Sequence, residues 1–172
     1  PFLNHPDLTI IGPGVNALTV SGNHLYRVFA INTGKKVSLS ELTLANGENG
    51  FGGGIASAGM LTINNCVITG CHAVNGGGIV QVNGTLDMTN TTVSGNSATF
   101  QGAAVNIQDG IANLTNCTIS GNSSQNSQGG IANVNALGVN STLNLLNCTV
   151  ANNTSVAPFD AEVWTANESS NP

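Results

Sequence analysis

The chain has 172 residues, of which 40% are hydrophobic, 4% aromatic and 6% charged. Three Lys and Arg residues stand against eight Asp and Glu residues, which argues against a basic surface that binds nucleic acid or anionic membranes. No apolar run reaches about 18 residues, so we expect no membrane insertion. With so few charges, the 26 Asn residues and the many Ser and Thr residues must keep the surface hydrated.

A degenerate repeat runs from residue 8 to residue 154. Its apolar anchor recurs at intervals of 24, 24, 25, 26 and 31 residues, at Val20, Leu44, Ile68, Val93, Ile119 and Val150. A second column lies two residues before each anchor, at Leu18, Leu42, Cys66, Thr91, Cys117 and Cys148. A third lies five residues before it, at Val15, Leu39, Ile63, Met88, Leu114 and Leu145. Repeats that align in three columns predict a solenoid in which each repeat forms one coil.

Within each repeat the spacing is that of a β-strand. Leu61 and Ile63 alternate with Thr62 and Asn64, and a turn follows after about five residues. Short strands that recur once per repeat must stack on their equivalents as parallel neighbours, about 4.8 Å apart. We therefore predict an all-β fold without helices, a right-handed, single-stranded parallel β-helix of about six coils of 24–26 residues, the last of 31.

Residues 1–172 are expected to form a single domain, with regular coils over residues 8–154 and a C-terminal extension or partial coil over residues 155–172. Residues 159–164 look like the first strand of a seventh, unfinished coil. The chain begins at Pro1 without a signal peptide, so we interpret it as processed or excerpted. Scarce Lys and abundant Asn, Thr and Gly favour an extracellular or cell-surface location.

One column of Asn residues falls between two predicted strands. It comprises Asn65, Asn90, Asn116 and Asn147, and Ala17 and Glu41 take its place in the first two coils. Asn tolerates the left-handed backbone conformation that a sharp corner needs. We predict that these side chains are buried and hydrogen-bond from coil to coil as a structural ladder. Glycine runs such as Gly52 to Gly54 predict a further corner, because they allow positive φ and close backbone approach.

The repeated strings GGGI, GMLTINNC and CTISGN resemble those of bacterial right-handed parallel β-helix proteins of the pectin-lyase-like superfamily. They are similar in particular to secreted or surface proteins whose repeats are related to those of chlamydial polymorphic outer-membrane proteins. The resemblance covers roughly residues 8–154 and implies the fold. Most members of these families are large surface proteins, passengers and adhesins, so it implies no particular reaction.

Charged residues and histidines form no recurring cluster in the sequence. A polysaccharide lyase needs clustered acids for calcium and a base for proton abstraction, but Glu41, Asp87 and Asp109 are scattered and Arg27 is the only arginine. His5, His24 and His72 occupy non-equivalent repeat positions, so we expect no metal site and no cofactor. The four cysteines contain no CxxC pair and do not indicate a metal site. Cys66, Cys117 and Cys148 are interpreted as small inward residues, with a Cys117–Cys148 disulfide left open, and Cys71 falls at the corner that Asn96 and Asn122 occupy in other coils.

Ten Asn-x-Ser/Thr sequons occur in the chain. We expect those in the ladder to be buried and inaccessible. Five others fall in predicted loops or tails and are candidate glycosylation sites, or else products of an Asn- and Thr-rich repeat: Asn83, Asn122, Asn140, Asn153 and Asn167.

A regular outward array is predicted beside the anchor column. Its first row is Thr19, Thr43, Val67, Thr92, Thr118 and Thr149. Its second row is Ser21, Ala45, Thr69, Ser94, Ser120 and Ala151. Flat arrays of this kind resemble ice-binding surfaces, but Thr is also favoured on any exposed strand.

We therefore expect a non-catalytic extracellular structural or surface protein that associates end to end, because a solenoid without caps leaves unpaired strands at both ends. The main alternative is a glycan-binding adhesin or passenger module. A polysaccharide lyase-like enzyme and an ice-binding protein are weaker alternatives. The expected partners are accordingly further copies of the chain and, under the main alternative, glycans.

Overall fold

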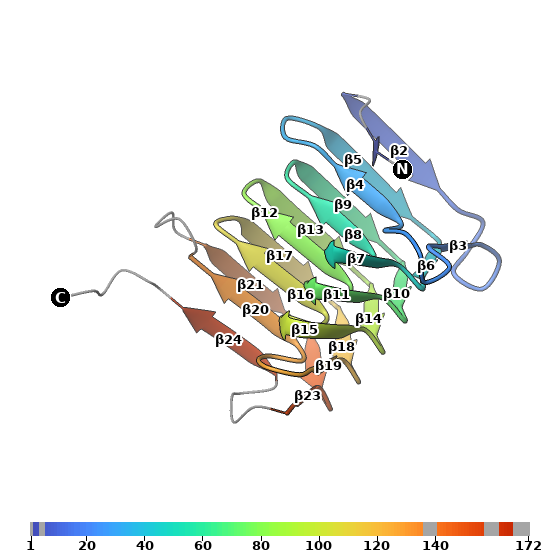
Figure 1. Ribbon diagram of the computed structural model, residues 1–172. Helices are drawn as coiled ribbons and strands as arrows, with labels where there is room; N and C mark the ends of the chain where they lie inside the picture. Colours follow the sequence, from blue (N-terminus) through green and yellow to red (C-terminus); the bar gives the residue numbers. More distant parts are fainter. Residues whose placement is uncertain (1, 4–5, 136–140, 157–161, 167–172) are drawn as a thin grey trace.

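The computed structural model describes residues 2–3, 6–135, 141–156 and 162–166 (Figure 1). In these ranges the chain forms β-strands and no helix, and every strand pairs in parallel with its equivalent one repeat away. The N-terminal and C-terminal coils lie at opposite ends of the stack (Figure 1). The prediction of an all-β parallel β-helix is thus confirmed.

Four parallel sheets run along the stack, and we number them in the order in which a coil visits them. Sheet I contains Asp7–Ile11 (β2), Lys36–Ser40 (β5), Met60–Asn64 (β9), Thr85–Thr89 (β13), Ile111–Thr115 (β17) and Thr142–Leu146 (β21). Sheet II contains Thr19–Ser21 (β3), Thr43–Ala45 (β6), Val67–Thr69 (β10), Thr92–Ser94 (β14), Thr118–Ser120 (β18) and Thr149–Ala151 (β22). The six strands of sheet I bound five complete turns.

The other two sheets complete each coil. Sheet III contains Glu48–Phe51 (β7), His72–Asn75 (β11), Ser97–Gln101 (β15), Ser123–Ser124 (β19) and Thr154–Ser155 (β23). Sheet IV contains Phe2–Leu3 (β1), Phe29–Ile31 (β4), Ile55–Ser57 (β8), Ile79–Val82 (β12), Val105–Gln108 (β16), Ile131–Val134 (β20) and Val163–Ala166 (β24). Of the segment predicted to begin a seventh coil, residues 159–161 lie outside the described residues, and β24 stacks on β20.

The anchor column forms as predicted. Residues Val20 to Val150 of this column pair in register through all six strands of sheet II. The four members in the middle coils, Leu44, Ile68, Val93 and Ile119, have no solvent exposure. The third column is also correct from the second coil onward.

One assignment in the third column was wrong. Ile10, and not Val15, pairs in register with Leu39 in sheet I. In the first coil ten residues separate Ile10 from Val20, whereas five separate Leu39 from Leu44. The extra residues form a wider turn between β2 and β3, so counting back a fixed number of residues reached the turn instead of the strand.

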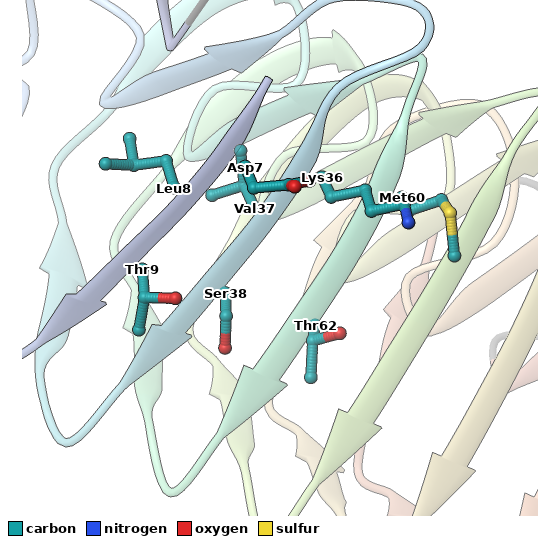
Figure 2. A pocket seen from close by; sticks show the side chains of 8 residues that line it. All are labelled: Asp7, Leu8, Thr9, Lys36, Val37, Ser38, Met60 and Thr62. Carbon is teal, nitrogen blue, oxygen red and sulfur yellow. The ribbon is translucent and has the colours of Figure 1, made fainter. Parts of the chain in front are cut away.

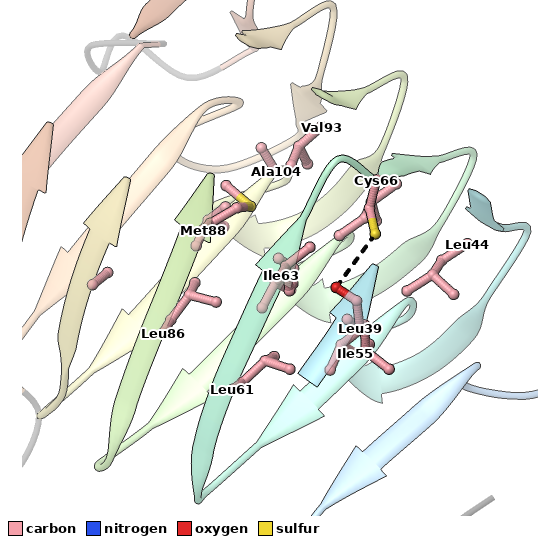
Figure 3. Close-up of a cluster of buried hydrophobic side chains, with 14 of the residues drawn as sticks. Leu39, Leu44, Ile55, Leu61, Ile63, Cys66, Leu86, Met88, Val93 and Ala104 are labelled. Carbon is pink, nitrogen blue, oxygen red and sulfur yellow. Dashed lines mark hydrogen bonds between the residues drawn. The ribbon is translucent and has the colours of Figure 1, made fainter. Parts of the chain in front are cut away.

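A continuous apolar core fills the stack (Figure 3). Leu39, Ile63 and Met88 follow one another along it and are completely buried. Their neighbours are mainly Leu, Ile and Val, each of which stabilises the fold by about 1.5–3 kcal/mol on full burial. Aliphatic side chains suit this core because neighbouring coils lie only one strand spacing apart.

The corner between sheets I and II carries the Asn column that we predicted. From the second coil onward its members have positive φ, namely Glu41 (57°), Asn65 (49°), Asn90 (51°), Asn116 (54°) and Asn147 (52°). We call this set the outer ladder. The Asn147 amide donates to Asn116 Oδ1 at 2.7 Å, that of Asn116 to Asn90 Oδ1 at 3.3 Å, and that of Asn65 to Glu41 Oε2 at 2.7 Å.

The four Asn side chains of the outer ladder are nevertheless exposed, so the prediction that Asn65, Asn90, Asn116 and Asn147 are buried was wrong. The bonds are also not continuous, since Asn90 Nδ2 donates to Asn64 Oδ1, at 3.5 Å, and not to Asn65. At this corner the left-handed residue directs its side chain outward, where water competes for the amide.

The buried ladder lies at the next corner, between sheets II and III. There the left-handed residues are Asn46, Gly70, Gly95, Gly121 and Asn152. The residue that follows each of the last four points inward and is buried, and we call this set, Cys71, Asn96, Asn122 and Asn153, the inner ladder.

The inner ladder repeats one bonding pattern from coil to coil. Asn122 Oδ1 accepts from the backbone N–H and from Nδ2 of Asn96, both at 3.0 Å. Asn153 Oδ1 likewise accepts from the backbone N–H and from Nδ2 of Asn122, at 3.1 and 2.8 Å. Because each amide satisfies buried backbone groups of two coils, the ladder fixes the register of the stack.

We predict that Asn122→Ala lowers the free energy of unfolding by about 3 kcal/mol or more, because it orphans the buried backbone N–H of Asn96 and removes the amide donor to the Val93 carbonyl. The matched control is Asn116→Gly, which removes an exposed ladder amide and keeps a residue suited to positive φ. It should cost less than about 1 kcal/mol. Urea denaturation of both variants measures the difference, and equal losses would contradict the assignment.

Candidate functional site

Sheet II presents the outward rows that the sequence predicted. Thr19, Thr118 and Thr149 are exposed, and the other members of the first row are half-buried. The two rows stack in register from β3 to β22. They form a face of hydroxyl and methyl groups without a charged side chain. Such a composition is that of an ordinary exposed strand surface.

Sheet IV carries a hollow on its outer face, with a volume of about 280 Å³. Ala56, Val80 and Val82 form part of its lining, the ring of Phe51 stands at one side, and the amide of Gln108 borders it. Phe51 remains 51% exposed. An aromatic ring beside small apolar side chains and an amide can pack against the apolar face of a small polar ligand.

The turn at Gly52 places Phe51 there. Gly52 has a φ of 60°, and a Cβ at this position would lie 2.2 Å from the carbonyl oxygen of Ile55. The chain therefore folds back tightly from β7 into β8, and Phe51 stands beside the outer face of sheet IV. The glycine run predicted a corner here, but the sequence did not predict a role for Phe51, because no aromatic residue recurs at its repeat position.

Sheet III brings Glu48, His72 and Ser97 into one outward row. His72 Nδ1 lies 2.9 Å from Ser97 Oγ, and Glu48 and His72 line a hollow of about 430 Å³ together with His24. The order Ser–His–Glu is that of a hydrolase triad. However, the backbone N–H of Ser97 donates to Cys71, so it is not free to stabilise an oxyanion. The row is best interpreted as polar side chains on the outward face of sheet III.

A smaller hollow of about 150 Å³ lies on the first strands of sheet I (Figure 2). Asp7, Lys36 and Met60 stand there in register, with Thr9, Ser38 and Thr62 in the next outward row (Figure 2). Its volume is below the roughly 300–1,000 Å³ of ordinary ligand pockets. Asp7 and Lys36 therefore border no sizeable site.

The acidic and basic groups considered for catalysis have structural partners. Arg27 donates to the carbonyl oxygens of Phe51 and Gly52 and to Asn49 Oδ1, and so covers the start of sheet III. Burial lowers the pKa of its guanidinium. Asp87 accepts from Asn113 Nδ2 at 2.8 Å. Among the described residues, no three His, Cys, Asp or Glu side chains are placed to hold a metal ion.

The cysteines, predicted to be small inward residues, also make hydrogen bonds. Cys66, Cys71 and Cys117 are buried, Cys148 is half-buried, and all four are free thiols. The thiols of Cys66 and Cys117 donate to the carbonyl two residues earlier, at 3.4 and 3.3 Å, as the Thr91 hydroxyl does at 2.9 Å. Burial raises the pKa of the thiols of Cys66, Cys71 and Cys117.

Side chains in this column also accept hydrogen bonds from the preceding coil. The backbone N–H of Cys66 donates to Thr91 Oγ1 at 3.3 Å, and that of Cys117 to Cys148 Sγ at 3.4 Å. Thr91 can therefore stand among Cys66, Cys117 and Cys148 in the column, because thiol and hydroxyl each supply a donor and an acceptor.

Two of the candidate glycosylation sites are placed differently from the prediction. Asn122 and Asn153 were expected in loops, but they belong to the buried inner ladder, so their amides are inaccessible in the folded chain. Asn83 is exposed, at a corner with a φ of 54°. Asn140 and Asn167 lie outside the described residues. Conversely, the sequons at Asn90, Asn116 and Asn147 carry exposed Asn side chains.

Comparisons with known proteins give no relative from which a function can be transferred. No protein-family model matches the chain, and no curated protein and no solved structure matches it. In the part of the chain that the structure describes, no helix is long and apolar enough to span a membrane.

The hydrogen-bonding column predicts how substitutions at Cys66 behave. Cys66→Thr restores the group found at Thr91 and should stay within about 0.5 kcal/mol of the parent stability. Cys66→Val has the shape of Thr but lacks the donor to Asn64, and should lose about 1–2 kcal/mol. Thermal and urea unfolding of the two variants test this. If the Val variant were as stable as the Thr variant, the side chains of this column would stabilise the fold by packing alone and not by hydrogen bonding.

Proposed function

We propose that the chain is a non-catalytic structural module of an extracellular or cell-surface protein. The observation that carries this proposal is the inner ladder, in which the recurring polar residues Asn96, Asn122 and Asn153 bond to one another inside the stack. Repetition in this chain therefore serves regular stacking. A stack built in this way holds the segments that adjoin it at a fixed separation, which suits a spacer or surface scaffold.

We also propose that the chain is a member of the bacterial right-handed parallel β-helix repeat proteins of the pectin-lyase-like superfamily, related to polymorphic outer-membrane protein repeats. Support comes from the agreement between motif and backbone. The GGGI strings begin at Gly52 and Gly76, which adopt positive φ, and the string CTISGN spans one corner, one sheet II strand and the next corner. The near-absence of charge and the abundance of Asn support the extracellular location.

Glycan binding is the second candidate function, and the hollow on sheet IV favours it. The Phe51 ring offers a stacking surface for the C–H face of a sugar, while Asn32 and Gln108 border the hollow with amide groups. Sugar hydroxyls both donate and accept hydrogen bonds, as amides do. This hollow would hold one or two sugar units of a longer chain.

End-to-end self-association stays a prediction. It rests on exposed apolar side chains in the outermost coils, among them Ile11 (72%) and Tyr26 (73%) at one end and Leu146 (66%) at the other. Burial of such groups against another copy would be favourable.

A glycan array separates the two functions. For a structural module we expect no glycan to bind above background. Saturable binding that is lost in Phe51→Ala but retained in Phe100→Ala would instead establish the hollow as a glycan site. Phe100 is the matched control, because its ring is 49% exposed on sheet III and does not line the hollow.

A further inference from the structure

One position in each coil lies directly before the sheet IV strand. In the first coil it is Val28, and the coil that stacks on Val28 has Gly47 at the inner-ladder position. In the later coils it is Gly54, Gly78, Ala104, Gly130 and Glu162. A Cβ at Gly54 would lie 2.5 Å from the carbonyl oxygen of Gly78, in the next coil, and one at Gly130 would lie 2.0 Å from that of Glu162. A following coil that carries an inner-ladder side chain therefore leaves little room here, and below such coils the position holds nothing larger than the methyl group of Ala104.

The direction of such a side chain is also defined. A Cβ at Gly54 would lie 3.2 Å from Cys71 Sγ, and one at Gly78 would lie 3.3 Å from Asn96 Nδ2. Cys71 and Asn96 are the inner-ladder residues of the coil that follows in each case. A side chain at this position thus points at the place of the next ladder residue.

Glu162 uses that direction. Its carboxylate accepts from the backbone N–H of Asn153 at 3.3 Å and from Asn153 Nδ2 at 2.6 Å. In the preceding coil, the backbone N–H and Nδ2 of Asn122 donate in the same way to Asn153 Oδ1, at 3.1 and 2.8 Å. The carboxylate therefore stands where the amide of a further coil would stand.

We propose that Glu162 is a stop residue, which ends the inner ladder and closes this end of the stack to a further coil that carries an inner-ladder side chain in register. An ionised carboxylate only accepts hydrogen bonds, so it satisfies Asn153 and has no donor to pass on. A coil added beyond it would bring its ladder residue against the carboxylate. The block applies equally to a second copy and to any other segment of polypeptide that places a side chain at the ladder position.

This inference goes beyond the proposed structural function, because it limits how the stack can be extended. It excludes in-register growth at the Glu162 end, and so leaves end-to-end association only with some other geometry there. The function proposed above does not depend on it, since a spacer works with an open or a closed end.

Two variants of the full chain test the stop residue. Glu162→Gly restores the residue found at Gly54, Gly78 and Gly130, and Glu162→Gln is the matched control that keeps the bulk and an acceptor oxygen. Sedimentation velocity over a hundredfold range of concentration should reveal larger species for the Gly variant alone. Association of both variants, or of neither, would overturn the stop role, with circular dichroism verifying that each remains folded.

Amide hydrogen exchange provides a second, local measurement. The backbone N–H of Asn153 should exchange at least tenfold faster in monomeric Glu162→Gly than in the parent chain, and nearly unchanged in Glu162→Gln. Unaltered protection of Asn153 in the Gly variant would overturn the capping contact, whatever the state of association.

Discussion

The stacking of equivalent residues at one strand spacing is the constraint on which the rest of this structure depends. Because each coil lies about 4.8 Å from the next, every position is repeated next to itself along the stack. A side chain that suits one coil must therefore suit its own copies above and below. Aliphatic residues satisfy this inside, amides and hydroxyls satisfy it at corners, and like charges do not. The low charge of the chain follows from its geometry as much as from its surroundings.

Corners carry the polar part of this arrangement. A left-handed residue turns the chain, and the residue after it points inward with a side chain that bonds to a neighbouring coil. Asn96 and Asn122 do this between sheets II and III, and Cys66 and Thr91 do it between sheets I and II. Amide, thiol and hydroxyl are interchangeable to this extent because each both donates and accepts. Buried polar groups that are satisfied in this way specify one register and disfavour slipped ones.

Much of the fold could be predicted from the repeat, since the anchor column alone defines one sheet and the order of coils. Periodicity does not define which side of a corner an Asn faces, and that is why the outer ladder was predicted to be buried. A signal was nevertheless present in the substitutions of each column. A carboxylate, that of Glu41, replaces Asn at the outer corner, where it is only half-buried, whereas the buried thiol of Cys71 replaces Asn at the inner one.

The sites were harder to predict because they break the repeat. Phe51 borders a hollow as a single aromatic residue in its row, and Glu162 differs from the small residues at its position in the four preceding coils. A search for equal spacing finds what recurs and passes over such exceptions. Their meaning depends on which atoms the next coil places nearby, and only the three-dimensional arrangement supplies that information.

The central claim is that the inner ladder couples neighbouring coils, and a double-mutant cycle between Asn96 and Asn122 measures this coupling most directly. If each amide works through the other, the double Ala variant should be more stable than the sum of the single losses implies, by about 1 kcal/mol or more. Single losses that add within about 0.3 kcal/mol would contradict the account, because each Asn would then stabilise only its own coil.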